Sequence, residues 1–176
     1  MRTANQLCHV RIAFLGPESS GKTTLAQAVA RALPGAFVPE YGRAYCERFG
    51  NDCNAQDLVH IAAGQLLAEE EAAARHPGLP LVADTDVLTT CTFAELYLGQ
   101  CPPLLEELAR LRSYDITFLL PPSVPHQADA IRLFGHRRQE HFALLQRRLK
   151  AASRAYYVVQ GQPLTERLAE VLQMLA

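Results

Sequence analysis

Short apolar runs alternate along this chain with longer stretches in which apolar and polar positions are mixed. The apolar runs stand at residues 10–15, 36–39, 79–83, 116–120 and 156–159, and each is predicted to form a strand. Between them, apolar residues recur three and four positions apart, the spacing of a helix that buries one face. Strands that alternate with helices favour a single parallel sheet covered on both faces, with right-handed crossovers.

The mixed stretches define the predicted helices. Leu25, Val29 and Ala32 share one face of the first, and Asn54 is placed to cap another. Residues 44–49 favour a helical turn or two. A basic stretch near residue 138 leads into a further helix that buries Phe142, Leu145 and Leu149. The remaining helices are predicted at 24–33, 55–75, 87–98, 104–111 and about 164–175.

The segment between the first strand and the first helix has the spacing of a P-loop, G-x-x-x-x-G-K-[ST]. Gly16 and Gly21 permit a tight loop whose backbone N–H groups surround phosphates, and the following helix directs its positive end at them. Lys22 would reach the β- and γ-phosphates. We therefore predict ATP binding by Gly16, Glu18, Ser19, Ser20, Gly21, Lys22, Thr23 and Thr24.

The apolar strand at 79–83 ends in Asp84, a pattern that places a carboxylate beside bound Mg²⁺ in P-loop proteins. Thr23 and Asp84 are the predicted metal ligands, which requires the two residues to lie within about 8 Å of each other. Asp86 has two interpretations: it contacts the substrate, or it caps the helix at 87–98.

A second group of polar residues is predicted to bind the phosphate acceptor. Glu40, Tyr41 and Arg43 follow the second strand, and ligands bind outside the carboxyl ends of such strands. Glu40 or Asp84 would take the proton of the acceptor hydroxyl, although Glu40 would equally suit an ion pair with Arg43. Gln65 lies on the apolar face of its helix, either as a satisfied core residue or as a substrate contact.

Basic residues follow the fourth strand, where P-loop kinases carry a lid. We predict a lid at about residues 122–138, with Arg132 and Arg137 stabilising the charge on the transferred phosphoryl group. Arg138 is interpreted as part of a solvated helix start. The predicted catalytic residues are thus Lys22, Glu40, Asp84, Arg132 and Arg137, and the predicted substrate-binding residues are Glu40, Tyr41, Arg43, Gln65, Asp86 and Asp129.

Composition narrows the class of protein. The 176 residues suit one domain, 1–176, and are 49% hydrophobic and 20% charged, as in globular proteins. A net charge of −1 gives no support for a nucleic-acid or membrane-surface partner. Five cysteines without a C-x-x-C pair suggest free thiols in a reducing compartment. Residues 1–9 are too polar for a signal peptide, so we expect a cytoplasmic protein.

Several motifs occur together in a recognisable order: GPESSGKTTLA, EYGR, a mid-chain helix with Gln65, DTD followed by TT, a strand opened by YD, and a proline-rich segment leading to DAIR and RR. From Arg11 to Leu172 the chain resembles the ribosylnicotinamide kinase domain of the NadR type. The resemblance implies a three-layer α/β/α P-loop fold of the nucleoside and nucleotide kinases, with a five-stranded parallel sheet and a lid.

The same resemblance implies ATP and Mg²⁺ as cofactors and phosphorylation of the 5′-hydroxyl of nicotinamide riboside, a small nucleoside. Two alternatives remain open: a kinase of another nucleoside or nucleotide, and a P-loop ATPase that acts as a regulatory switch. The chain departs from the family before the lid. His126 follows Pro125 where the family tends to have Trp, and Ala130 stands in DAIR where it tends to have Gly.

Overall fold

The computed structural model describes residues 10–123, 135–161 and 163–176. Its centre is one parallel sheet of five strands in the order β2-β3-β1-β4-β5. The strands are β1 (Arg11–Leu15), β2 (Ala36–Val38), β3 (Leu81–Asp84), β4 (Ile116–Leu119) and β5 (Tyr157–Val158). The predicted three-layer α/β fold is confirmed.

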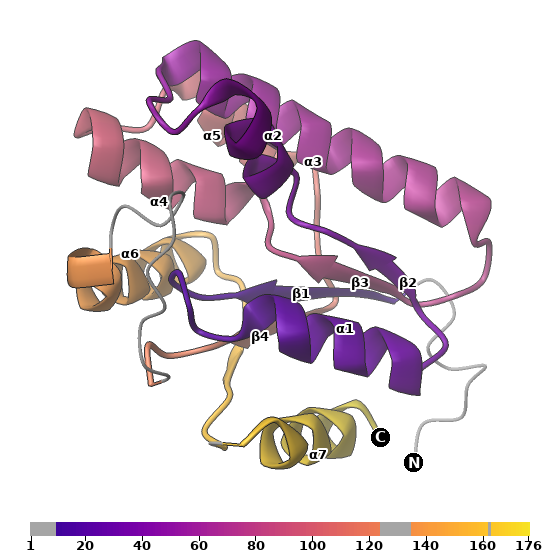
Figure 1. Ribbon diagram of the computed structural model, residues 1–176. Helices are drawn as coiled ribbons and strands as arrows, with labels where there is room; N and C mark the ends of the chain where they lie inside the picture. The colour runs from indigo at the N-terminus through magenta and orange to yellow at the C-terminus, as the bar shows by residue number, and fades with distance from the viewer. Residues whose placement is uncertain (1–9, 124–134, 162) are drawn as a thin grey trace.

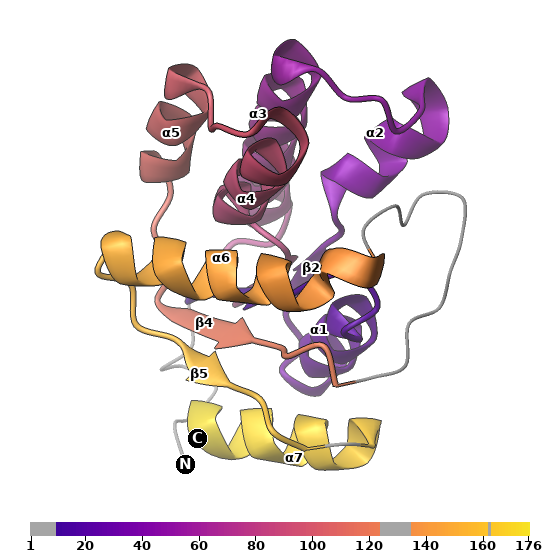
Figure 2. The same ribbon diagram turned by 90° about the vertical axis from the view of Figure 1, so that its left-hand side faces the viewer.

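Two unequal layers of helices cover the sheet (Figure 1). One face carries α1 (Lys22–Ala32) and α7 (Leu164–Leu175), which bury Leu25, Val29 and Val171 against Phe14 and Phe118. The other face carries the remaining helices, seen end-on or crossing the sheet in Figure 2. These are α2 (Tyr41–Phe49), α3 (Ala55–Arg75), α4 (Val87–Leu98), α5 (Pro103–Arg110) and α6 (Arg138–Ala151), which a short 3₁₀ turn, η2 (Gly135–Arg137), precedes.

Helix α4 lies at the centre of the second layer and is buried over most of its surface, including three threonines and a cysteine. Helix α4 contacts α3, α5 and α6, and its first eight residues, Val-Leu-Thr-Thr-Cys-Thr-Phe-Ala, contain no charged residue; Glu95, which follows them, pairs with Arg147 and Arg148 of α6. Short hydroxyl-bearing side chains suit this position, because they can be hydrogen-bonded within the helix: the Thr92 hydroxyl donates to Thr89 O at 2.6 Å.

The strand order determines where a ligand would bind. β1 lies between β3 and β4, and the loop after β1 leads to α1 on one face, whereas the chain after β3 leads to α4 on the other. Crevices form at such a divergence, outside the carboxyl ends of the strands. The P-loop, Asp84 and the segment after β2 therefore meet at one edge of the sheet.

Candidate functional site

The P-loop adopts a backbone that requires glycine at two positions. Gly21 has φ 86° and immediately precedes α1, and Gly16 has φ 153°. A Cβ at Gly16 would lie 2.6 Å from Leu120 O, a distance too short for any side chain. Gly16 thus lies at the base of the loop, while the other predicted nucleotide-binding residues, from Glu18 to Thr24, line a pocket above it.

Lys22 and Thr23 begin α1 and both line this pocket. The Lys22 ammonium reaches back and donates to Pro17 O at 3.4 Å, so it lies over the loop as predicted. The Thr23 hydroxyl donates to Asp84 Oδ2 at 2.6 Å. The predicted adjacency of Thr23 and Asp84 is confirmed, and it follows from the pairing of β3 with β1, which sets Asp84 beside Phe14.

Asp84 is a buried carboxylate that is incompletely satisfied. Burial raises its pKa and the Glu40 carboxylate raises it further, whereas the Lys22 ammonium, the Thr23 hydroxyl and the Arg43 guanidinium act in the opposite sense. Its Oδ1 atom has no hydrogen-bond partner among the described residues. The Asp84 carboxylate oxygen and the Thr23 hydroxyl oxygen are the kind of ligands that bind a magnesium ion or one of its waters.

Two arginines hold the P-loop from outside. Arg167 of α7 is 3% exposed and donates from Nη1 to Ser20 O at 2.7 Å, from Nε to Gly161 O at 2.8 Å and from Nη2 to Ser123 Oγ at 2.9 Å. Arg138, also buried, donates to Ser19 O at 3.2 Å. Because a trans peptide directs its C=O and N–H to opposite sides, anchoring Ser20 O turns the Gly21 N–H away from Arg167.

The sequence interpretation missed Arg167 and placed Arg138 in solvent. A signal for Arg167 existed: it stands four residues before Val171 and eight before Leu175, on the face of α7 that packs against the sheet. The structure places Arg137 outside the pocket, and its predicted catalytic role stays a prediction. Its guanidinium pairs with Glu140 at 2.6 Å and donates to Leu96 O at 3.0 Å, and it does not line the pocket.

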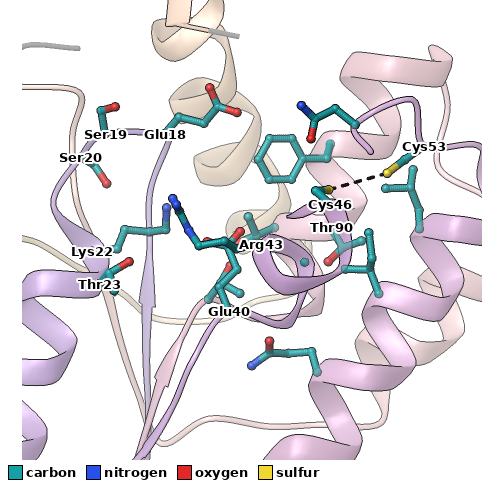
Figure 3. A pocket seen from close by; sticks show the side chains of 18 of the residues that line it. Glu18, Ser19, Ser20, Lys22, Thr23, Glu40, Arg43, Cys46, Cys53 and Thr90 are labelled. Carbon is teal, nitrogen blue, oxygen red and sulfur yellow. Dashed lines mark hydrogen bonds between the residues drawn. The ribbon is translucent and has the colours of Figure 1, made fainter. Parts of the chain in front are cut away.

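The pocket itself has a volume of about 300 Å³ and continues from the P-loop across the sheet edge to the helical layer. Figure 3 shows the loop residues and Lys22 on one side, Glu40 and Arg43 in the middle, and Cys46 and Cys53 on the far side. The far side is mainly apolar. It is formed by Cys46 of α2, by Cys53 in the segment between α2 and α3, by Leu58 and Ile61 of α3, and by Phe93 and Tyr97 of α4.

The predicted acceptor residues Glu40, Arg43 and Gln65 come together in this pocket. Gln65 is 2% exposed; its Oε1 accepts from the Tyr41 backbone N–H at 2.9 Å, and its side-chain amide also acts on the Glu69 carboxylate one turn later, whose pKa burial raises and this amide lowers. The Tyr41 ring is not a pocket residue. It lies against Gly64, where an added Cβ would be 2.3 Å from the ring, so the absence of a side chain at Gly64 makes room for it.

Asp86 is a structural residue, as the capping alternative foresaw. Its Oδ1 accepts from the Thr89 backbone N–H at 3.1 Å at the start of α4, and its Oδ2 pairs with Arg154. Asp86 is 1% exposed and does not line the pocket. This geometry does not support the alternative in which Asp86 contacts the substrate: the residues with a hydroxyl that α4 supplies to the pocket are Thr89, Thr90 and Tyr97.

Replacing Asp86 with alanine is expected to lower the free energy of unfolding by about 3 kcal/mol. The change removes a helix cap, which contributes about 1 kcal/mol, and leaves the buried Arg154 charge without its carboxylate. Asp86→Asn should cost less, since an asparagine still caps the helix. Urea denaturation of both variants measures this. Equal stability of the alanine variant and the parent protein would contradict the assignment.

Cys46 and Cys53 face each other with 3.9 Å between their sulfur atoms. Burial raises the pKa of the Cys46 thiol to about 12, and the pKa of Cys53 is also raised by burial. Both thiols are then protonated at neutral pH and act as small apolar groups in the pocket wall. This environment matches the prediction of free thiols.

Alkylation of these two thiols is expected to be slow. Because the thiolate is the reacting form, iodoacetamide at pH 8 should label Cys46 about 100-fold more slowly than free cysteine. The rate should rise as the pH approaches the raised pKa of the thiol. Peptide mass spectrometry after timed labelling gives the rate for each site; labelling at the rate of free cysteine would show that the thiols are solvated.

Two further predicted residues, Asp129 and Arg132, lie outside the described residues, as does most of the predicted lid at 122–138. The prediction of a single domain is likewise untested. Within the described parts of the chain, none of the helices has the length and apolar character needed to cross a membrane.

Comparison with known proteins places these features in a family. The family model described as AAA domain matches residues 11–167. The trifunctional NAD biosynthesis/regulator protein NadR of Salmonella typhimurium is 33% identical over 128 residues, and the NadR protein of Escherichia coli is equally similar. The match covers 70% of this chain but 31% of the length of each relative.

Solved structures agree on the fold. A NadR protein crystallised in complex with NR superimposes with a TM-score of 0.81 at 21% identity, over 98% of this chain and 51% of the other. The thymidylate kinase of Ehrlichia chaffeensis superimposes with a TM-score of 0.69 at 16% identity, over 96% of this chain and all of that enzyme. The architecture is therefore that of P-loop kinases.

Proposed function

The chain belongs to the AAA domain family and carries a P-loop kinase domain of the NadR type, and from this premise we propose that it phosphorylates nicotinamide riboside with ATP. The product would be the mononucleotide, a step of NAD biosynthesis. One observation carries the proposal: a single pocket joins the P-loop to a carboxylate, Glu40, and then to an apolar chamber that Gln65 also lines.

The P-loop half of the pocket supports ATP binding. Lys22 supplies a point charge for the transferred phosphoryl group, and Arg138 and Arg167 keep the loop carbonyls turned outward. Thr23 and Asp84 would hold Mg²⁺, since the Asp84 Oδ1 atom is a buried acceptor without a partner. When bound there, Mg²⁺ neutralises charge on the phosphates.

The other half supports a small acceptor with a hydroxyl group. Glu40 lines the pocket, whereas Asp84 is buried beneath Thr23 and does not. This favours Glu40 over Asp84 as the group that orients the acceptor hydroxyl and takes its proton. Phe93 and Gln65 line this half, so an aromatic ring and a side-chain amide are available to a flat base that carries a carboxamide. The relatives named NadR support nicotinamide riboside as that acceptor.

A substrate screen tests the proposal. ATP consumption is measured with nicotinamide riboside, deoxycytidine, thymidine and thymidine monophosphate, and each product is identified by mass spectrometry. We expect the riboside to give the largest kcat/KM and a product heavier by one phosphoryl group. Efficient turnover of thymidine or its monophosphate without turnover of the riboside would move the proposal to another acceptor. Failure with every acceptor would favour a regulatory ATPase.

A further inference from the structure

Thr85 is a β-branched residue held in a backbone conformation that suits glycine. It lies between Asp84, the last residue of β3, and Asp86, the cap of α4, and its φ is 89°. A β-branched side chain at this φ is an outlier that costs on the order of 1–3 kcal/mol. Such a conformation persists only when its surroundings impose it, and sites that impose it are often functional.

The neighbours of Thr85 account for how the conformation is imposed. Its own N–H donates to Phe14 O at 3.1 Å, which continues the pairing of β3 with β1. On one side, the Asp84 carboxylate is fixed by the Thr23 hydroxyl. On the other, the Asp86 side chain caps α4 and pairs with Arg154. The backbone at Thr85 thus joins two anchored carboxylates and cannot relax on its own.

The Thr85 hydroxyl has nothing to bind among the described residues. Thr85 is 5% exposed, and its Oγ1 atom is buried without a hydrogen-bond partner. A buried hydroxyl without a partner is unfavourable, and native structures rarely contain one without a reason. The pocket offers the reason, because Thr85 lines it together with Ser20, whose buried hydroxyl likewise has no partner among the described residues.

The sheet order places Thr85 where donor and acceptor meet. β3 lies between β1, which leads to the P-loop, and β2, which leads to Glu40. A residue directly after β3 therefore stands between the phosphate site and the acceptor carboxylate. Lys22, Thr23 and the loop backbone would surround the phosphates, whereas the polar residues left for an acceptor are Glu40, Arg43, Asn51, Gln65, Tyr97 and the threonines of this wall.

We propose that Thr85 is a substrate-binding residue whose hydroxyl forms a hydrogen bond with the sugar of the phosphate acceptor. This rests on the proposed kinase function and adds a contact that selects for a hydroxylated acceptor. In this proposal the strained backbone holds the hydroxyl in a rigid position between the two aspartates, where the acceptor would meet it. Serine keeps this hydroxyl, and valine keeps the shape and the strain but removes it.

The experiment compares Thr85→Val and Thr85→Ser with the parent protein. For Thr85→Val, kcat/KM for nicotinamide riboside should fall by about 10- to 100-fold, while the Kd of a non-hydrolysable ATP analogue stays unchanged. The Tm of Thr85→Val should equal or exceed that of the parent, because the unpaired hydroxyl is gone. Thr85→Ser should retain most of the activity. Thr92→Val, which removes a paired buried hydroxyl outside the pocket, should lower the Tm and leave kcat/KM unchanged.

Three results for Thr85→Val would overturn the inference: an unchanged kcat/KM, a Kd for the ATP analogue that rises as kcat/KM falls, or a lower Tm. The first would mean that no substrate group meets the hydroxyl, the second that it serves the nucleotide, and the third that it stabilises the fold. Binding of the riboside is measured by calorimetry as well. Parent protein that binds the riboside through Thr85 without turning it over would refute the kinase function and leave this contact standing.

Discussion

Replacing Lys22 with alanine is expected to reduce kcat for phosphoryl transfer by about 100- to 1,000-fold, because the variant lacks the point charge on the transferred phosphoryl group. In the structure the Lys22 ammonium lies over the P-loop, and its one hydrogen bond to a described residue is a long one, 3.4 Å to Pro17 O. The side chain is therefore ready to exchange that carbonyl for a phosphate, and little of the fold depends on it.

The chain offers a matched control, because its one other lysine, Lys150, is exposed at the end of α6. Lys150→Ala removes the same charge away from the pocket and should leave kcat unchanged. Circular dichroism and the Tm report whether either variant is misfolded. A folded Lys22→Ala protein with more than about a tenth of the parent activity would be incompatible with a transition-state contact worth several kcal/mol.

Glu40→Gln is expected to lower kcat/KM for the riboside by about 100-fold and to change the Kd of an ATP analogue little. The substitution preserves the size of the side chain but removes its capacity to take a proton from the acceptor hydroxyl. Glu40 immediately precedes α2 and lines the pocket beside Arg43, between the P-loop and the two cysteines, so its carboxylate is placed to meet the acceptor rather than the nucleotide.

Glu47→Gln is the control for this variant, since Glu47 lies on an exposed part of the same helix. Steady-state kinetics with the riboside, together with calorimetry for the ATP analogue, separates the two effects. Full activity in Glu40→Gln would show that Glu40 does not serve as the proton acceptor. Weaker binding of the ATP analogue by the Glu40→Gln variant would show that Glu40 contacts the nucleotide.

The strands, the P-loop and the Asp84 position could be predicted because each depends on local sequence. Gly16 and Gly21 are required by the loop backbone, and an apolar run that ends in an aspartate beside a P-loop strand determines the Thr23–Asp84 contact. Glu40, Arg43 and Gln65 could also be predicted, because the carboxyl ends of neighbouring parallel strands open on one crevice.

The remaining site residues depend on contacts between distant segments. Arg167 reaches Ser20 across 147 positions, and Asp86 meets Arg154 across 68. A contact with a distant residue decides whether a polar side chain at a strand end faces the pocket or the core. The local sequence pattern does not show which distant residue that is. Thr85 was missed for another reason: nothing in the sequence Asp-Thr-Asp indicates a positive φ at a threonine, because propensity alone excludes it.

The most direct test of the account follows the γ-phosphate of ATP by ³¹P nuclear magnetic resonance in a reaction with nicotinamide riboside and Mg²⁺. We predict that the γ-phosphate signal is replaced by a phosphomonoester signal in a one-to-one ratio with ADP. Appearance of inorganic phosphate in place of the phosphomonoester, at a rate independent of the riboside, would contradict a kinase and identify an ATPase.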